Sequence, residues 1–262
     1  PWCSPSLLGV TAEDRAHIIV FDYNDAASLD AAVNAAGDDL AAILLTAFQH
    51  DVGKDQHLPQ AAFLAHARKI CDRTGVALIL DDVRAGFRLD VRGSWARYGV
   101  KPDLAAYSKA IANGWPLAAV AGAERFREGA GKVFVTGSFW YGSAAMAAAV
   151  KTVQILRDSD ALAHTEAMGE RFRTGLSEIS ARHGFTLRQT GPVQMPMVLF
   201  DGGLELKIAN AFCLAALRRG IYLHPKHNMF LCAAHTPGDI DRALEAADGA
   251  FRDIVSAGVL AA

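Results

Sequence analysis

The chain lacks the features that mark a secreted, membrane or nucleic-acid-binding protein. Its four cysteines are far apart and form no Cys-x-x-Cys pair, which argues against a zinc site or a disulfide scaffold. No apolar run approaches the roughly 20 residues that a membrane-spanning helix needs, and residues 1–10 lack the pattern of a signal peptide. Basic and acidic residues number 26 and 28, with no basic block. We therefore expect a cytoplasmic protein with free thiols that binds neither nucleic acid nor membrane.

Glycine-rich phosphate-binding motifs are also missing. No Gly-x-Gly-x-x-Gly or Walker pattern occurs, and Gly114, Gly122 and Gly137 stand alone. A nucleotide-dependent enzyme on a doubly wound sheet would need such a fingerprint, so that possibility is weak. The chain also starts at Pro1 without Met, on a Pro-Trp-Cys-Ser-Pro run typical of the inside of a longer protein. We expect that its beginning is missing.

What is present is an ordinary globular composition, with 52% hydrophobic and 21% charged residues in 262, enough for a sizeable core. Short apolar runs alternate with amphipathic stretches, a pattern typical of a mainly parallel sheet covered by helices. The predicted strands of this part are residues 17–21, 41–46, 76–81, 104–108, 117–121 and 132–136. Helices are expected over residues 26–36 and 60–74, and Gly75 ends the second one.

The pattern changes after Gly142. An Ala-rich helix over residues 143–156 continues past Asp158 into a second helical stretch that reaches Arg182. Strands are then expected at residues 185–189, 194–200, 221–223 and 230–233, with helices at 206–219 and from 237 to about 255. Helices and short strands without strict alternation predict a smaller α+β domain. We therefore expect a large α/β domain over residues 1–152 and a small C-terminal α+β domain over residues 153–262.

Two polar side chains stand at the ends of predicted strands. Asp81 follows an apolar run, and Lys109 follows the strand that starts at Leu104. An Asp at such a place can simply cap a loop, and most lysines are only solvated. Ligands of open parallel sheets, however, bind at the carboxyl ends of the strands. Together, the two residues are what a pyridoxal phosphate site requires, because lysine holds the aldehyde as a Schiff base and aspartate keeps the pyridine nitrogen protonated.

Residues 78–88 (LILDDVRAGFR) and 95–109 (WARYGVKPDLAAYSK) resemble the class III aminotransferase family of fold-type I pyridoxal phosphate enzymes, and within it the glutamate semialdehyde aminomutase branch. The family typically reads Asp-Glu-Val, Gly-Phe-Arg, Tyr-Gly-x-x-Pro-Asp-Leu and the Schiff-base lysine. The resemblance continues through residues 137–139, 146–149, 219–222, 230–236 and 239–241. It implies a PLP-dependent transferase fold of type I, α/β, with an incomplete, mainly parallel large domain and a smaller C-terminal α+β domain.

The resemblance also implies roles for single residues. Lys109 would be the catalytic Schiff-base lysine, Asp81 the partner of the pyridine nitrogen, and Val83 the side chain packed on the ring. Ser138 stands where the family usually has a Thr that binds the cofactor phosphate of the neighbouring subunit, so a homodimer with a shared active site is implied. Gln49 stands where some relatives place an amide near the cofactor's phenolic oxygen. Core packing, a turn and a surface loop remain the alternatives for Val83, Ser138 and Gln49, and no metal is expected.

The sequence departs from the family around the expected cofactor. Thr46 and Ala47 replace Glu-Pro, and Asp82 replaces the usual Glu. Phe230 stands where many α-amino-acid transaminases hold the substrate carboxylate with an Arg. A simple exchange between an α-amino acid and 2-oxoglutarate is therefore less favoured. The reaction we expect moves an amino group on a small-molecule amine or amino acid, between molecules in an aminotransferase or within one molecule in an aminomutase.

The family's phosphate-binding turn, which would precede the matching region, is absent from this sequence. That absence leaves an alternative, a non-catalytic truncated homologue that acts as a dimerising scaffold. Retention of both Lys109 and Asp81 argues against it, since a scaffold has no need of that pair.

Overall fold

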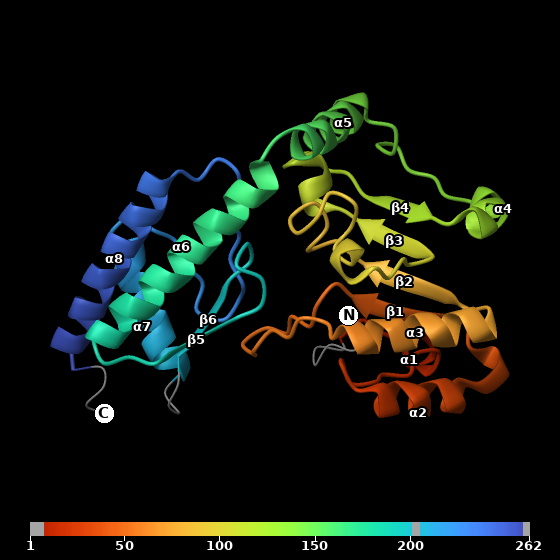
Figure 1. The fold of residues 1–262 in the computed structure, drawn as a ribbon, viewed down its shortest axis with the longest axis horizontal. Helices are drawn as coiled ribbons and strands as arrows, with labels where there is room; N and C mark the ends of the chain where they lie inside the picture. The colour runs from red at the N-terminus through yellow and green to blue at the C-terminus, as the bar shows by residue number, and fades with distance from the viewer. Residues whose placement is uncertain (1–7, 201–204, 259–262) are drawn as a thin grey trace.

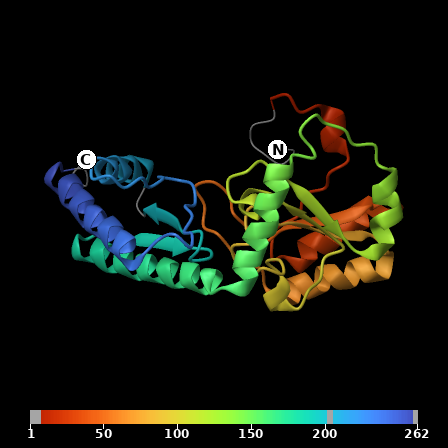
Figure 2. The ribbon, with the colours of Figure 1, turned by 90° about the horizontal axis from the view of Figure 1, so that it is seen from above.

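The computed structural model describes residues 8–200 and 205–258, and these form two lobes joined by helices (Figures 1 and 2). Cys71, Cys213 and Cys232 are free thiols, as expected, and Cys3 lies outside the described residues. Within the described ranges, no helix is both long enough and apolar enough to cross a membrane.

The first lobe is built on a four-stranded sheet with the order β1-β2-β3-β4. Its strands are β1 (Ala42–Thr46), β2 (Ala77–Asp81), β3 (Leu104–Tyr107) and β4 (Ala119–Gly122). The first three strands run parallel, and β4 is antiparallel to β3. The mainly parallel sheet of the predicted α/β fold is therefore confirmed.

Helix α3 (Ala61–Thr74) packs against β1 and β2, and α2 (Ala26–Ala36) packs on α3 (Figure 1). One face of α3 is buried, as its periodicity predicts, and carries Phe63, Ala67, Ile70 and Cys71. Gly75 ends the helix with φ +79°, a left-handed conformation that glycine adopts without steric cost. Shorter elements of this lobe are α1 (Ala12–Ala16), η1 (Gly37–Asp39), η2 (Ala96–Tyr98), η4 (Glu124–Phe126) and α4 (Arg127–Lys132).

Two consecutive helices join the lobes. Helix α5 (Ser143–Asp158) packs on the short helix η3 (Lys109–Ala112), where Ala149 meets Ile111 and Ala112. Helix α6 (Ala161–Arg182) then runs into the second lobe (Figure 1). The predicted boundary at residue 152 falls within α5 and stays a prediction.

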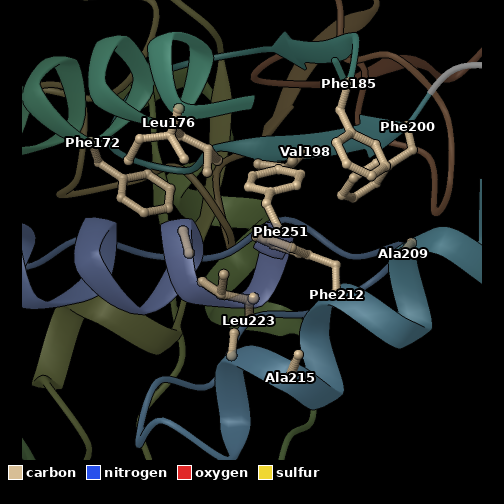
Figure 3. Close-up of a cluster of buried hydrophobic side chains, with 14 of the residues drawn as sticks. Phe172, Leu176, Phe185, Val198, Phe200, Ala209, Phe212, Ala215, Leu223 and Phe251 are labelled. Carbon is tan, nitrogen blue, oxygen red and sulfur yellow. The ribbon is translucent and has the colours of Figure 1, made fainter. Parts of the chain in front are cut away.

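The second lobe packs α6, α7 (Glu205–Leu217) and α8 (Pro237–Ser256) with a hairpin of β5 (Leu187–Thr190) and β6 (Met197–Phe200). Figure 3 shows aromatic rings meeting between these elements; the ring centroids of Phe212 and Phe251 are 4.6 Å apart, and those of Phe185 and Phe251 4.9 Å. Helix α8 begins at a capping box in which Thr236 and Asp239 satisfy each other's backbone N–H groups. This arrangement is the small α+β unit that was expected.

Four predicted strands are not strands in the structure: residues 17–21, 132–136, 221–223 and 230–233. An apolar run becomes a strand only when another backbone pairs with it, and no described strand pairs with any of the four. Residues Ile19, Val20 and Phe134 are accordingly exposed. Ile221 instead donates its N–H to the Ala216 carbonyl and closes the end of α7, and Leu231 makes a single bond to Gln194.

Candidate functional site

The carboxyl ends of the three parallel strands meet at one edge of the first sheet. The strand register sets Asp81 of β2 beside Thr46 of β1 and Ala106 of β3. Lys109 comes three residues after Ala106, at the start of η3. Asp81 and Lys109 therefore lie at the same sheet edge, as their positions in the sequence predict, and Val83 follows Asp81 directly.

Lys109 has an unusual backbone and an altered acidity. Its φ of +49° is left-handed, a backbone conformation that residues other than glycine, Asn and Asp rarely adopt. Lys109 is an exposed residue. Loss of water around part of its side chain nevertheless lowers the pKa of its amine, Arg84 and Arg88 lower it further, and Asp81 opposes these effects. A lowered pKa leaves more of the amine uncharged near neutral pH, which is the form that attacks a carbonyl group.

The two adjacent carboxylates at the end of β2 have different surroundings. Asp82 is fully buried and accepts hydrogen bonds from the Ser94 N–H at 3.0 Å and the Ser94 hydroxyl at 2.5 Å. Burial raises the pKa of Asp82. Asp81 is half-buried, and its Oδ1 accepts the Val83 N–H at 3.1 Å. Asp82 thus fixes the turn at residues 93–95, and Asp81 is the carboxylate available at the edge.

A tight turn follows Asp82. The Gly86 N–H donates to the Asp82 carbonyl at 2.8 Å. A Cβ atom on Gly86 would lie 2.6 Å from that carbonyl oxygen and 2.8 Å from the Tyr107 ring, so the turn requires glycine. Arg84 lies within this turn, close enough to Asp81 for their charges to interact.

Sequence reasoning missed two arginines of this turn, which link the edge to the second lobe. Arg84 donates to the Asn228 side-chain oxygen. The Arg88 Nε donates to the Arg84 carbonyl at 3.0 Å, and its guanidinium lies 4.5 Å from the centre of the Phe230 ring. Burial lowers the pKa of both arginines. Their spacing of four residues in a turn was the only available signal.

His50 also lies near Arg84 and Asp81 at this edge. Its ring packs edge-on against Phe48, with the centroids 5.2 Å apart. Burial lowers the pKa of His50, Arg84 lowers it further, and Asp81 opposes both effects. The imidazole is therefore held neutral beside the edge near neutral pH.

Gln49 and Ser138 are placed less directly. The Gln49 backbone pairs with His57 through N–H to oxygen distances of 2.9 and 3.1 Å, which fixes the loop after β1 at the same sheet edge. Ser138 is exposed in the segment between α4 and α5. Across the described residues, no hydrogen bond joins the Gln49 or Ser138 side chain to Asp81 or Lys109, so both expected roles stay predictions.

Comparisons with known proteins give a consistent result. The model of the family described as Aminotransferase class-III matches residues 4–237. The aminopentol aminotransferase of Sphingopyxis macrogoltabida is 46% identical over 255 residues, which are 97% of this chain and 60% of that protein. The glutamate-1-semialdehyde 2,1-aminomutase of Desulfitobacterium hafniense (strain DSM 10664 / DCB-2) is 31% identical over 265 residues, with 95% of this chain and 61% of that protein covered.

A solved structure is similar throughout. The FumI protein of Sphingopyxis sp. MTA144, in its PLP internal aldimine form, aligns with a TM-score of 0.96 and 45% identity, over 99% of this chain and 63% of that one. The present chain therefore spans about 60% of the length of the relatives it matches.

Proposed function

Because the chain belongs to the class-III aminotransferase family, we propose that the protein is a PLP-dependent aminotransferase that takes the amino group of an amine substrate and transfers it to a carbonyl acceptor. The observation that carries the proposal is the juxtaposition of Asp81 and Lys109 at one sheet edge. The similarity to a protein named aminopentol aminotransferase, at 46% identity, supports transfer between molecules more than transfer within one.

The residues at the edge fit pyridoxal phosphate. Lys109 supplies an amine with a lowered pKa, Asp81 a carboxylate for the ring nitrogen, and Val83 an apolar side chain for the ring face. Gln49 would face the phenolic oxygen from the loop after β1. When bound, the cofactor supplies an aromatic ring that withdraws electrons from the substrate carbon bearing the amino group.

The protein's own groups would then handle the protons. The Lys109 Nζ would take the proton that leaves the substrate carbon bearing the amino group and would later donate that proton again. Asp81 would hold a proton on the ring nitrogen, because its half-buried side chain is the carboxylate available at this edge. His50, held neutral, would add no competing charge beside that pair.

We also propose that the active protein is a homodimer in which Ser138 of one subunit contributes to the phosphate site of the other. Supporting this, the segment before α5 exposes the large apolar side chains Phe134, Phe139 and Tyr141. Exposed apolar patches of this kind are typical of interfaces. Light scattering of the full-length protein should give twice the mass of one subunit.

A cytoplasmic location stays a prediction from the sequence.

The test of the cofactor assignment is reductive labelling. The full-length protein is incubated with pyridoxal phosphate, reduced with borohydride and digested, and the modified peptide is located by mass spectrometry. We expect the label on Lys109, its loss together with all turnover in Lys109→Ala, and normal behaviour of the control Lys69→Ala, an exposed lysine on α3. Absence of label from the wild-type protein would overturn the proposal and favour the scaffold alternative.

A second assay separates the two possible reactions. An aminotransferase forms a carbonyl product from an amine donor only when a carbonyl acceptor is present. An aminomutase would convert a single substrate without any acceptor. We expect strict dependence on the acceptor, and turnover without one would instead support the aminomutase activity.

A further inference from the structure

The loop between β1 and α3 crosses from the first lobe to the hairpin of the second lobe (Figure 1). Its base is closed where the Gln49 backbone pairs with His57. Among residues 49–58, Gln56 alone is buried, and the other side chains are exposed or half-buried. Packing of the loop's own apolar side chains therefore does not hold it in its path.

Polar contacts with β5 hold the tip of this loop instead. The Gln56 N–H donates to the Thr190 hydroxyl oxygen at 2.8 Å. The carboxylate of the preceding residue, Asp55, pairs with Arg188 of the same strand. Two consecutive residues of the first lobe are thus bound to the second lobe, more than 130 positions further along the chain.

A second segment of the same lobe touches both the loop and the site. The Gly53 N–H donates to the Lys226 carbonyl at 2.8 Å. Two residues later, Asn228 accepts a hydrogen bond from Arg84, which lies near Asp81. The second lobe therefore contacts the reactive sheet edge through the turn after β2 and through the loop after β1.

The buried side chain at the tip makes this docking costly. Gln56 is 4% exposed and packs on Gly191, where a Cβ atom would lie 2.3 Å from the Gln56 Oε1. Neither polar atom of its amide has a hydrogen-bond partner among the described residues. A buried amide without partners is less stable than one in water. The docked loop therefore depends on the bond to Thr190 and on the ion pair with Arg188.

We propose that Thr190 and Arg188 are positioning residues of the active site, which act through this loop on Gln49. The route is short, because Gln56 is bonded to Thr190 and its neighbour His57 exchanges backbone hydrogen bonds of 2.9 and 3.1 Å with Gln49. A tip that leaves β5 displaces the backbone that carries Gln49. This inference rests on the proposed function, in which the Gln49 amide faces the cofactor.

The first test measures hydrogen exchange of the loop in the full-length holoenzyme. Thr190→Val keeps the side-chain shape but removes the hydroxyl, so residues 49–57 should exchange about 2- to 10-fold faster, the value of one hydrogen bond. Thr190→Ser retains the hydroxyl and should stay within about twofold of the wild type. Asp55→Asn weakens the ion pair and should accelerate the same segment.

The control for this experiment is Thr186→Val, a change of the same chemistry at an exposed threonine just before β5. It should leave the exchange of residues 49–57 unchanged. Exchange that is unchanged in both Thr190→Val and Asp55→Asn would show that these contacts do not hold the loop.

The second test asks whether the position of the loop matters to the cofactor site. In absorbance titrations of the full-length protein with pyridoxal phosphate, Thr190→Val should raise Kd at least about twofold, because only the docked loop holds Gln49 in place. Added to Gln49→Ala, the same change should raise Kd by a smaller factor, since residues that act through one another are not additive. An unchanged Kd, or equal factors in both backgrounds, would overturn the positioning role.

The outcomes also separate this inference from the proposed function. A wild-type protein that neither binds pyridoxal phosphate nor takes the label on Lys109 would refute the proposed function. A wild-type protein that does both, with Thr190→Val indistinguishable from Thr186→Val, would refute this inference alone.

Discussion

The two lobes differ in how completely they bury their apolar side chains. In the second lobe, Phe212 and Phe251 are at most 1% exposed and lie among helices and a strand that belong to the same lobe (Figure 3). In the first lobe, Val120 on β4 is 72% exposed and Leu44 on β1 is 57% exposed. The residues proposed for chemistry lie in the first lobe. Both lobes thus have a buried core, and the first lobe combines its core with a reactive edge and with apolar surface typical of interfaces.

The largest effect should come from the core of the second lobe. Phe251→Ala removes a ring that contacts Phe185, Phe200 and Phe212, and should lower the free energy of unfolding by about 3–5 kcal/mol. The control in the first lobe is Lys69→Ala, which should change it by less than about 0.5 kcal/mol because that side chain is exposed on the surface of α3. Urea titrations measure both. Similar losses of unfolding free energy in the two variants would contradict the difference between the lobes.

A pH titration tests Asp82, a buried carboxylate of the first lobe. The folded state holds the proton of Asp82 more tightly than its ordinary pKa of 3.8 allows, because burial raises that pKa. The unfolded chain releases the proton first, so the contribution of Asp82 to the free energy of unfolding should fall as pH rises from 3.8 to the raised value, by at most about 1.4 kcal/mol per pH unit. Asp82→Asn should remove this contribution, so the difference in the free energy of unfolding between wild type and Asp82→Asn should change with pH over that range. A difference that does not change with pH would contradict the assignment.

Helix caps with the same chemistry should matter differently in the two lobes. Thr236 caps the long, packed α8 within a capping box, and Thr11 caps the five-residue α1, which buries no side chain. We expect Thr236→Ala to cost about 1 kcal/mol and Thr11→Ala less than half of that. Thermal unfolding of the two variants, side by side, gives the difference. Equal costs would show that local capping outweighs tertiary packing here.

The smallest effect concerns the acidity of the reactive edge. Arg84 and Arg88 lower the pKa of the Lys109 amine, so removing one positive charge should raise it. We expect Arg88→Met to shift the pH dependence of Lys109 acetylation upward in cofactor-free protein. Competitive labelling followed by mass spectrometry reports that shift. No shift, or a downward one, would argue against electrostatic coupling across this edge.

Local patterns predicted the elements that carry the site. An apolar run ending at Asp81, the buried face of α3 with Gly75 after it, and the Pro237 start of α8 are all local signals, and each has its counterpart in the structure. Strands depend on partners distant in sequence, which is why the apolar runs at residues 17–21 and 132–136 were misassigned.

The residues of the site that the sequence did not predict were missed for the same reason, because their partners are distant in the sequence. Arg84 and Arg88 resemble solvated turn residues until their partners are known, and those partners, Asn228 and Phe230, lie more than 140 residues away. In the sequence, Asp82 stood out only as a departure from the usual family Glu near the expected cofactor, whereas in the structure its carboxylate accepts two hydrogen bonds from Ser94. Nothing in the sequence signals the left-handed backbone of Lys109.

That backbone places residue 109 under two opposed demands. A side chain in this conformation costs about 1–2 kcal/mol that glycine does not incur. A laboratory evolution experiment that rewards thermal tolerance alone would therefore favour glycine at 109 and enrich for inactive protein. A selection for thermal stability therefore needs activity as a second criterion, because a residue with a costly backbone conformation is also the one proposed to carry the reaction.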